Sequence, residues 1–344
     1  METIKAFCKR KNIEVSAKRY GIDALGAMAQ GLFCSLLIGT IIKTLGAQLG
    51  VPFLTDIGTY AMSVSGPAMA VAIGYALKAD PMVLFSLAAV GYAANAEGGA
   101  GGPLAVLIIA VVAAECGKAV SKETKIDILV TPAVTILVGV ALAKWIAPPI
   151  GTAASAFGIV IDNATKLQPF WMGIAVSVLV GIALTLPISS AAICSVLGLT
   201  GLAGGAAVAG CCANMVGFAI MSFRENRWGG IVSQGLGTSM LQVPNILRHP
   251  AILVPPTLAS AILGPFGTTV FQMLNEGISG GMGTCGFVGQ IGTFTTMLQN
   301  GSEWWSILLR VLLLHIAAPA ALSLLFSEIM RRLGWIKQND MLLD

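Results

Sequence analysis

The feature that most constrains this chain is the scarcity of charge over long stretches, each interrupted once by a glutamate. Between residues 81 and 114 the only Asp, Glu, Lys, Arg or His side chain is Glu97, and between residues 250 and 302 it is Glu276. About 20 apolar residues in a helix cross a bilayer, and a charge at its centre costs about 2.5 kcal/mol or more. The pattern therefore predicts membrane-spanning helices and marks both glutamates as functional candidates.

The composition excludes an ordinary soluble protein. Only 10% of the 344 residues are charged and 56% are hydrophobic, whereas soluble domains carry about 25% charged residues. The basic residues gather before the first apolar stretch and after the last one, at Lys5, Lys9, Arg10, Lys11, Lys18, Arg19, Arg331, Arg332 and Lys337. Because lysine and arginine beside a span stay on the cytoplasmic side, we expect both termini in the cytoplasm. The partner expected for the basic N-terminus is the bilayer and not a nucleic acid.

These observations predict an all-α polytopic membrane protein of about ten transmembrane helices in two inverted repeats of about five. The expected order is a cytoplasmic basic amphipathic lead-in (1–22), a first transmembrane repeat (23–149), an interfacial connector (150–168), a second repeat (169–330) and a cytoplasmic tail (331–344). Within this scheme one span covers 126–146 and stops at Pro148-Pro149, and another covers 228–247. The glycine- and alanine-rich run 197–217 is expected to let helices pack closely.

A recurring motif supports two related halves. The sequence EGGAGG at 97–102 returns as EGISGG at 276–281, and Asn95 and Asn275 precede the two motifs. Glycine adopts backbone conformations closed to other residues, and non-helical backbone at membrane depth must be buried in protein or line a watery cavity. We therefore expect two re-entrant loops that meet at a polar site, in halves of opposite topology as in many transporters.

The predicted substrate site contains Asn95, Glu97, Asn275 and Glu276. The carboxylates could accept hydrogen bonds from a solute, or one could carry a coupling proton. In the alternative interpretation each glutamate only caps loop amides.

Other polar residues in apolar surroundings extend the list of candidates. His249, Gln290 and Asn214 are predicted substrate contacts, although His249 could be an exposed loop residue and the two amides could join helices. His315 lies on an apolar helix, where we expect a structural histidine with satisfied hydrogen bonds.

No motif indicates catalysis. The chain has no nucleophile elbow, P-loop or HExxH sequence, and its seven cysteines form no CxxC pair. We therefore expect no enzyme activity, no metal site and no cofactor.

Three segments together resemble a known family. Residues 94–103 (ANAEGGAGGP), 125–132 (KIDILVTP) and 283–290 (GTCGFVGQ) look like the EIIC membrane proteins of the phosphotransferase system, in particular the stand-alone, perfringolysin-regulator-like branch. The resemblance implies a multi-pass protein of the bacterial cytoplasmic membrane that binds a sugar through a glutamate and a histidine. Glu276 and Glu97 match the carboxylate, and His249 matches the imidazole.

The resemblance also implies a partner. EIIC proteins work with a phosphorylated EIIB component, which this chain does not supply, so a separate EIIB-like protein or another form of coupling is expected. The leading hypothesis is a transporter that moves a small, sugar-like polar solute by alternating access. The alternative is a membrane-bound ligand sensor or regulator without flux. Glycine-rich membrane surfaces would also allow a homodimer.

Overall fold

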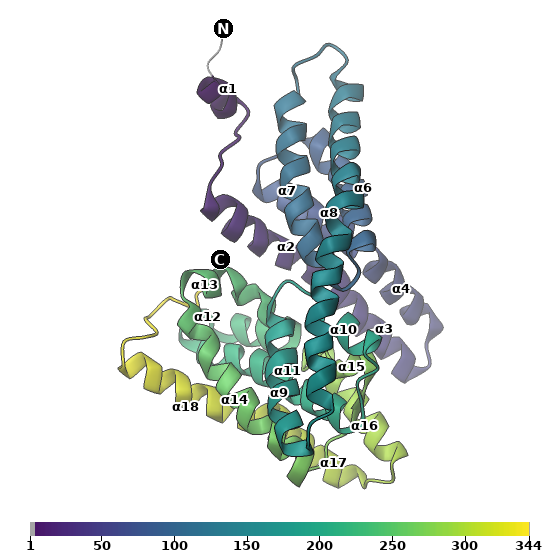
Figure 1. The fold of residues 1–344 in the computed structure, drawn as a ribbon, viewed down its shortest axis with the longest axis vertical. Helices are drawn as coiled ribbons and strands as arrows, with labels where there is room; N and C mark the ends of the chain where they lie inside the picture. The colour runs from purple at the N-terminus through teal and green to yellow at the C-terminus, as the bar shows by residue number, and fades with distance from the viewer. Residues whose placement is uncertain (1–3, 344) are drawn as a thin grey trace. The chain divides into compact units, whose positions relative to one another are not determined.

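The computed structural model describes residues 4–343, which are almost entirely helical (Figure 1). Residues 1–3 of the predicted lead-in and residue 344 of the predicted tail lie outside the described residues. The chain divides into two compact units between Ala154 and Ser155.

The α-helices that begin in the first unit are α1 (Ile4–Arg10), α2 (Ala24–Leu32), α3 (Ile38–Leu49), α4 (Pro52–Ser63), α5 (Ser65–Ala76), α6 (Pro81–Gly98), α7 (Gly102–Val120) and α8 (Asp127–Thr165). Those of the second unit are α9 (Pro169–Thr185), α10 (Ser190–Val196), α11 (Gly201–Met221), α12 (Phe223–Gly230), α13 (Val243–Arg248), α14 (Val254–Pro265), α15 (Gly277–Gly280), α16 (Val288–Gln299), α17 (Trp304–Val311) and α18 (Ala318–Arg332). One two-residue strand, β1 (Asn275–Glu276), pairs antiparallel with Thr200 and Gly201 through isolated bridges.

The helices confirm the all-α polytopic membrane class. Within the described residues, six helical stretches are long and apolar enough to cross a membrane, and α4 and α5, bent by 48° at their junction, provide a seventh if they form one broken span. The six stretches are Lys18–Leu49, Pro81–Val120, Asp127–Thr165, Gly201–Met221, Pro250–Val270 and Trp304–Arg332. The second of them contains two helices, α6 and α7, with a turn between them at residues 99–101. The count of about ten spans and the inverted repeat are not confirmed.

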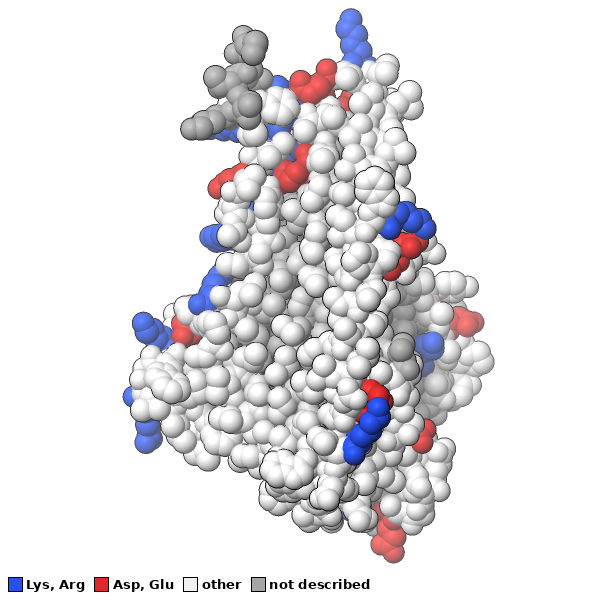
Figure 2. Space-filling view, viewed as in Figure 1, with Lys and Arg blue, Asp and Glu red and all other residues white. Residues whose placement is uncertain are grey.

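Large apolar side chains cover the surface as a membrane protein requires. The face shown in Figure 2 is mostly uncharged, with Lys, Arg, Asp and Glu in small separate groups. On α8 the side chains of Leu137 and Trp145 are 70% and 79% exposed. Water would not favour such exposure of an entire helix, whereas lipid does.

The predicted end of the span 126–146 is wrong. Helix α8 passes through Pro148 and Pro149 and continues to Thr165, so residues 150–165 are helical. Proline can be accommodated within membrane helices because other groups satisfy the backbone it frees. The interfacial position of this segment stays a prediction.

The predicted span 228–247 is not one helix. The chain there forms the end of α12, a π-helical turn η4 (Ile231–Gly237), a 3₁₀ turn η5 (Ser239–Gln242) and the short helix α13. Four glycines lie in this stretch, and Gln234 and Gln242 are fully buried. Buried amides need hydrogen-bond partners, and the irregular path allows these two side chains to find them.

Helix α11 is the centre of the second unit. It is buried over 94% of its most apolar stretch and packs against α9, α14 and α18. The contacts are backbone to backbone: a Cβ added to Gly210 would lie 1.9 Å from the Ser177 carbonyl oxygen, and one added to Gly264 on α14 would lie 2.0 Å from that of Gly173 on α9. The small residues thus allow the close packing expected from run 197–217.

The lead-in segment is tied to the first unit by charged side chains. Arg19 donates to the Leu77 carbonyl at 2.5 Å, and buried Lys118 donates to the carbonyls of Asn12 and Leu77 at 2.7 and 3.1 Å. Glu123 forms ion pairs with Arg10 and Lys11. These contacts hold the segment before α2 against the turns that follow α5 and α7.

Candidate functional site

The glycine break around Glu276 is an irregular hairpin, which we define as residues 271–287, between the helical segments that end at Val270 and begin at Val288. Its backbone leaves the helical region, since Gln272, Gly277, Gly283, Gly286 and Phe287 all have positive φ. Gly204 on α11 lets the hairpin approach closely, because a Cβ there would lie 2.2 Å from the Asn275 carbonyl oxygen. The non-helical backbone agrees with the break that the sequence predicts at this motif, and its position within a membrane stays a prediction.

Asn275 fixes the hairpin. Its side chain is fully buried; Nδ2 donates to the Gly289 carbonyl and to Thr293 Oγ1, both at 2.9 Å. Its Oδ1 accepts from the Glu276 amide at 2.7 Å and from Ser279 Oγ at 2.5 Å. These four bonds use the full capacity of the amide, so Asn275 is engaged entirely with its own hairpin and with α16 in this arrangement.

Glu276 is held in place by its backbone and leaves its carboxylate open. The next residue, Gly277, donates to the Leu199 carbonyl at 2.8 Å and has a φ of +50°, which glycine adopts without strain. The residue is exposed. Over the part of the chain that the structure describes, no hydrogen bond or ion pair engages its carboxylate. An ionised carboxylate with a fixed backbone and free oxygens can accept hydrogen bonds from a ligand.

The first glycine break has a different structure. Helices α6 and α7 form a tight antiparallel hairpin around residues 99–101: Gly98 lies against Ala105 at one end and Gly117 against Val83 at the other. Asn95 packs against Gly66 and Gly102, is partly exposed and, within residues 4–343, its side chain makes no hydrogen bond.

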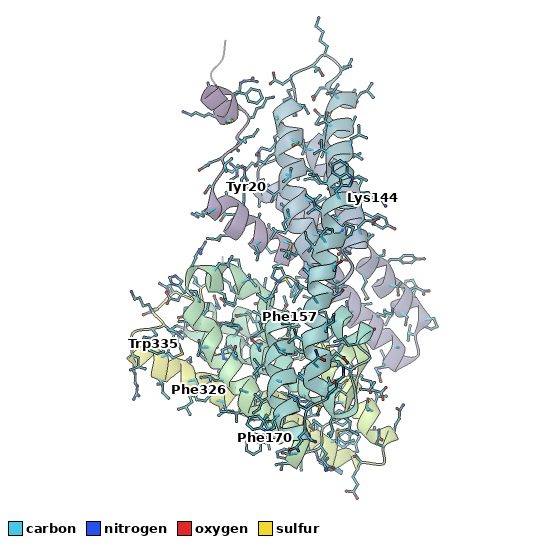
Figure 3. The ribbon with its side chains drawn as sticks, viewed as in Figure 1. Tyr20, Lys144, Phe157, Phe170, Phe326 and Trp335 are labelled. Carbon is cyan, nitrogen blue, oxygen red and sulfur yellow. The ribbon has the colours of Figure 1, made fainter. Side chains whose placement is uncertain are left out.

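Glu97, unlike Glu276, has a partner. Lys144 of α8, labelled in Figure 3, donates to its carboxylate at 2.5 Å. The pair is partly exposed, with 33% of the Glu97 and 63% of the Lys144 side chain accessible. Lys144 is the only basic residue between 126 and 165. A single cation in one apolar stretch and a single anion in another could have indicated this pair from the sequence. The sequence prediction missed Lys144.

Gln290 and His315 form a buried polar pair behind the hairpin. Gln290 Nε2 lies 3.3 Å from His315 Nδ1 and 3.3 Å from Cys212 Sγ. Among the described residues, neither Gln290 Oε1 nor His315 Nε2 has a partner, although both atoms are buried. The expectation that all hydrogen bonds of His315 are satisfied is therefore wrong at Nε2. Gln290 Oε1 and His315 Nε2 are both available to a ligand, and their side chains contact each other.

Asn214 lies inside the helix packing of the second unit. It is fully buried, donates to the Gly210 carbonyl at 3.1 Å and to Ser260 Oγ at 3.2 Å, and accepts from Thr185 Oγ1 at 3.3 Å. It thereby joins α11 to α9 and α14, which is the geometry of an interhelical hydrogen bond.

His249 contacts the C-terminal tail. Its Nε2 lies 3.5 Å from an oxygen of Asp340, and 45% of its side chain is exposed. The predicted role of His249 as a sugar contact stays a prediction.

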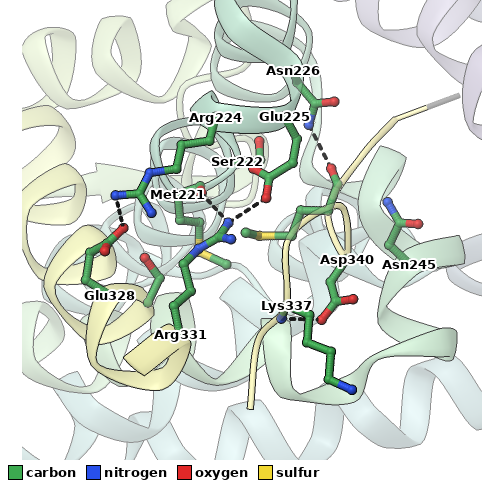
Figure 4. Close-up of polar contacts among 12 residues, drawn as sticks. Met221, Ser222, Arg224, Glu225, Asn226, Asn245, Glu328, Arg331, Lys337 and Asp340 are labelled. Carbon is green, nitrogen blue, oxygen red and sulfur yellow. Dashed lines mark hydrogen bonds and ion pairs between the residues drawn. The ribbon is translucent and has the colours of Figure 1, made fainter. Parts of the chain in front are cut away.

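The tail is bound by three amide side chains, those of Asn226, Gln242 and Asn245. The Met341 carbonyl accepts from Asn226 at 2.7 Å, shown in Figure 4, and from Gln242 at 2.9 Å, while the Leu342 carbonyl accepts from Asn245 at 2.8 Å. Met341 itself is fully buried in an apolar cluster. Nothing in the sequence pattern of residues 331–344 indicated this docking.

A metal centre is not part of either break. Over residues 4–343, no three His, Cys, Asp or Glu side chains are grouped closely enough to hold a metal ion.

Comparison with known proteins places the chain in a family. The family model described as "Phosphotransferase system, EIIC" matches residues 22–343, which is almost the whole chain. The chain belongs to the EIIC family of the phosphotransferase system. Searches of curated proteins and of solved structures gave no significant match. This EIIC protein is thus a multi-pass membrane component of a sugar-transporting phosphotransferase system, and the stand-alone regulator-like branch stays a prediction.

Proposed function

We propose that this EIIC protein binds a small, sugar-like polar solute at the 271–287 hairpin and that the carboxylate of Glu276 is its principal contact. The observation that supports the proposal most is the contrast between the two glutamates. Glu97 is neutralised by Lys144, whereas Glu276 is exposed and, in the part of the chain described, unpaired. A carboxylate only accepts hydrogen bonds, and the hydroxyls of a sugar can donate them.

Four of the other predicted or neighbouring polar residues, and Glu97, take supporting roles in this proposal. Asn275 positions Glu276 through its hydrogen bonds to the hairpin and α16. The open atoms of Gln290 and His315 offer a second, deeper contact to a hydroxyl group. Asn95 and Glu97 belong to the first unit, and we propose that they contribute from their own hairpin as the solute moves.

We infer that movement occurs by alternating access, with both termini in the cytoplasm. Transporter sites built on interrupted membrane backbone commonly work in this way. The EIIC component is the membrane permease, so the proposed source of the phosphoryl group is a separate EIIB-like protein.

Binding is tested first, with purified protein and a panel of sugars. A sugar present at 100 times its Kd stabilises the protein by about 2.7 kcal/mol, which a thermal unfolding experiment detects. We expect Glu276→Gln to abolish the sugar-dependent increase in Tm. Glu303→Gln is the matched control, because Glu303 is also exposed and, like Glu276, has no partner in the described chain.

The proposal fails if no sugar stabilises the wild-type protein, or if Glu276→Gln responds to the sugar as wild type does. Counterflow in proteoliposomes then separates a transporter from a ligand sensor. Exchange of labelled sugar supports alternating access, whereas binding without exchange favours the sensor.

A further inference from the structure

A pocket lies on the surface of the second unit, apart from the hairpin. It measures about 300 Å³ and is enclosed by the end of α11, α12, the start of η4 and the last turns of α18. Its walls are mainly apolar and include Ile220, Ile231 and Leu324, while Arg224, Trp228 and Glu328 are its polar or amphipathic residues. This volume is at the lower end of those of small-molecule sites and suits part of a single acyl chain.

The surroundings of the pocket have the features typical of a membrane–water interface. Two spans end beside it, at Met221 and at Arg332. Trp228 is 73% exposed and packs edge-on against Phe223, with ring centroids 5.6 Å apart. Exposed tryptophan at a helix end is typical of the membrane–water interface.

The two charged residues that line the pocket are paired with each other, and a further arginine follows on the same helix. Arg224 forms an ion pair with Glu328 at 3.0 Å (Figure 4). Arg227, three residues further on, is exposed and has no partner within the described part of the chain. Arg227 does not line the pocket itself, but it directly precedes Trp228, which does, so an unpaired cation lies next to the pocket along the chain.

The surrounding charges point in the same direction. Glu225 forms an ion pair with Arg331 at 2.7 Å. Arg332, the residue after Arg331, is exposed. Basic residues after two spans favour the cytoplasmic side, where the leaflet carries anionic lipids.

From this geometry we propose that the pocket is a binding site for an anionic phospholipid. One acyl chain occupies the apolar cavity beside Ile220, Ile231 and Leu324, and the phosphate binds Arg227 and Arg224. The mainly apolar walls favour an acyl chain over a free sugar. The site is distinct from the proposed solute site at Glu276.

The test uses the delipidated full-length protein and native mass spectrometry with two lipids of identical acyl chains, phosphatidylglycerol and phosphatidylcholine. A basic residue near a lipid surface contributes about fivefold to binding of an anionic lipid. We expect wild type to bind phosphatidylglycerol at least about tenfold more tightly than phosphatidylcholine. The double substitution Arg224→Gln with Arg227→Gln should remove this preference, and Leu324→Trp should weaken binding of both lipids by filling the cavity.

The controls test charge and folding separately. Arg248→Gln removes an exposed arginine elsewhere in the second unit and should leave the preference unchanged. Arg224→Lys keeps the charge and should keep the preference, even if the double variant folds poorly.

Equal binding of the two lipids by wild type, or an unchanged preference in the double variant, would overturn the proposal. So would displacement of phosphatidylglycerol by an equal concentration of glycerol phosphate, because that result would assign the site to a free phosphate. Occupation of the pocket by a second copy of the chain would appear as a protein-concentration-dependent loss of lipid binding, and it would also refute the assignment.

Discussion

Removing one partner of the buried Arg331–Glu225 ion pair should be among the most damaging single changes in the second unit. Arg331 Nη2 donates to Glu225 at 2.7 Å and to the Met221 carbonyl at 3.2 Å (Figure 4). Only 1% of the Glu225 side chain and 10% of the Arg331 side chain are exposed. The pair connects α12 to the end of α18 and closes the helix ends around α11.

The magnitude follows from burial. Arg331→Met leaves the Glu225 carboxylate buried without its cation, and breaking a buried pair in this way costs about 3–5 kcal/mol. The penalty is increased by Glu225 Oε2, which already has no partner in the described structure. Replacing both residues by apolar ones, Glu225→Leu with Arg331→Met, removes the stranded charge as well. The double variant should therefore return to within about 1–2 kcal/mol of wild type.

The free energy of unfolding can be measured by titrating mixed micelles with sodium dodecyl sulfate and following helicity by circular dichroism. The matched control is Lys166→Met, which breaks the exposed pair between Lys166 and Asp162 at 2.8 Å, with 67% and 42% of the side chains accessible. An exposed pair of this spacing contributes about 0.3–0.5 kcal/mol. A loss below about 1 kcal/mol in Arg331→Met, or a double variant no more stable than either single one, would refute the reasoning from burial.

Three further predictions concern packing, pH and the tail. Gly264→Ala should cost about 1–3 kcal/mol or more, because its Cβ would meet backbone 2.0 Å away, whereas Gly267→Ala on the same helical stretch meets nothing within 4 Å; comparing the two unfolding free energies checks this. Hydrogen bonds from Arg10 and Lys11 lower the pKa of Glu123 to about 2. The stabilisation from this contact between the lead-in and the loop is complete above the ordinary pKa of about 4.5 and decreases as the pH falls towards about 2. The contact itself breaks when the carboxylate protonates near pH 2, and its loss should appear there as increased mobility of a spin label at Cys8. Deleting residues 336–343 should lower Tm, because it exposes the pocket of Met341 and leaves the amides that hold the tail without carbonyl partners; an unchanged Tm would mean that the tail contributes no stability.

The membrane class and the positions of the two breaks could be predicted because they depend on local composition. A run of apolar residues needs lipid or protein around it wherever it lies, and a glycine cluster around a lone charge disrupts such a run in any fold. The resemblance to EIIC proteins rested on three short segments, and it was confirmed over residues 22–343. The prediction of a span over 228–247 was wrong because the structure of this segment depends on distant contacts. Its glutamines look compatible with a helix in sequence, and only their burial beside the tail and Ser222 explains the irregular path.

The candidate site shows the same division. The sequence by itself determined that Glu97 and Glu276 are the lone acidic groups of two apolar, glycine-broken stretches. Only the tertiary structure decided that Glu97 is paired with Lys144, 47 positions away, and that Glu276 has an open carboxylate, while Asn275 and Asn214 are engaged in packing. The physical reason is that the cost of a charge at membrane depth is a property of the residue, whereas the relief of that cost depends on which distant side chain the fold places within hydrogen-bonding distance.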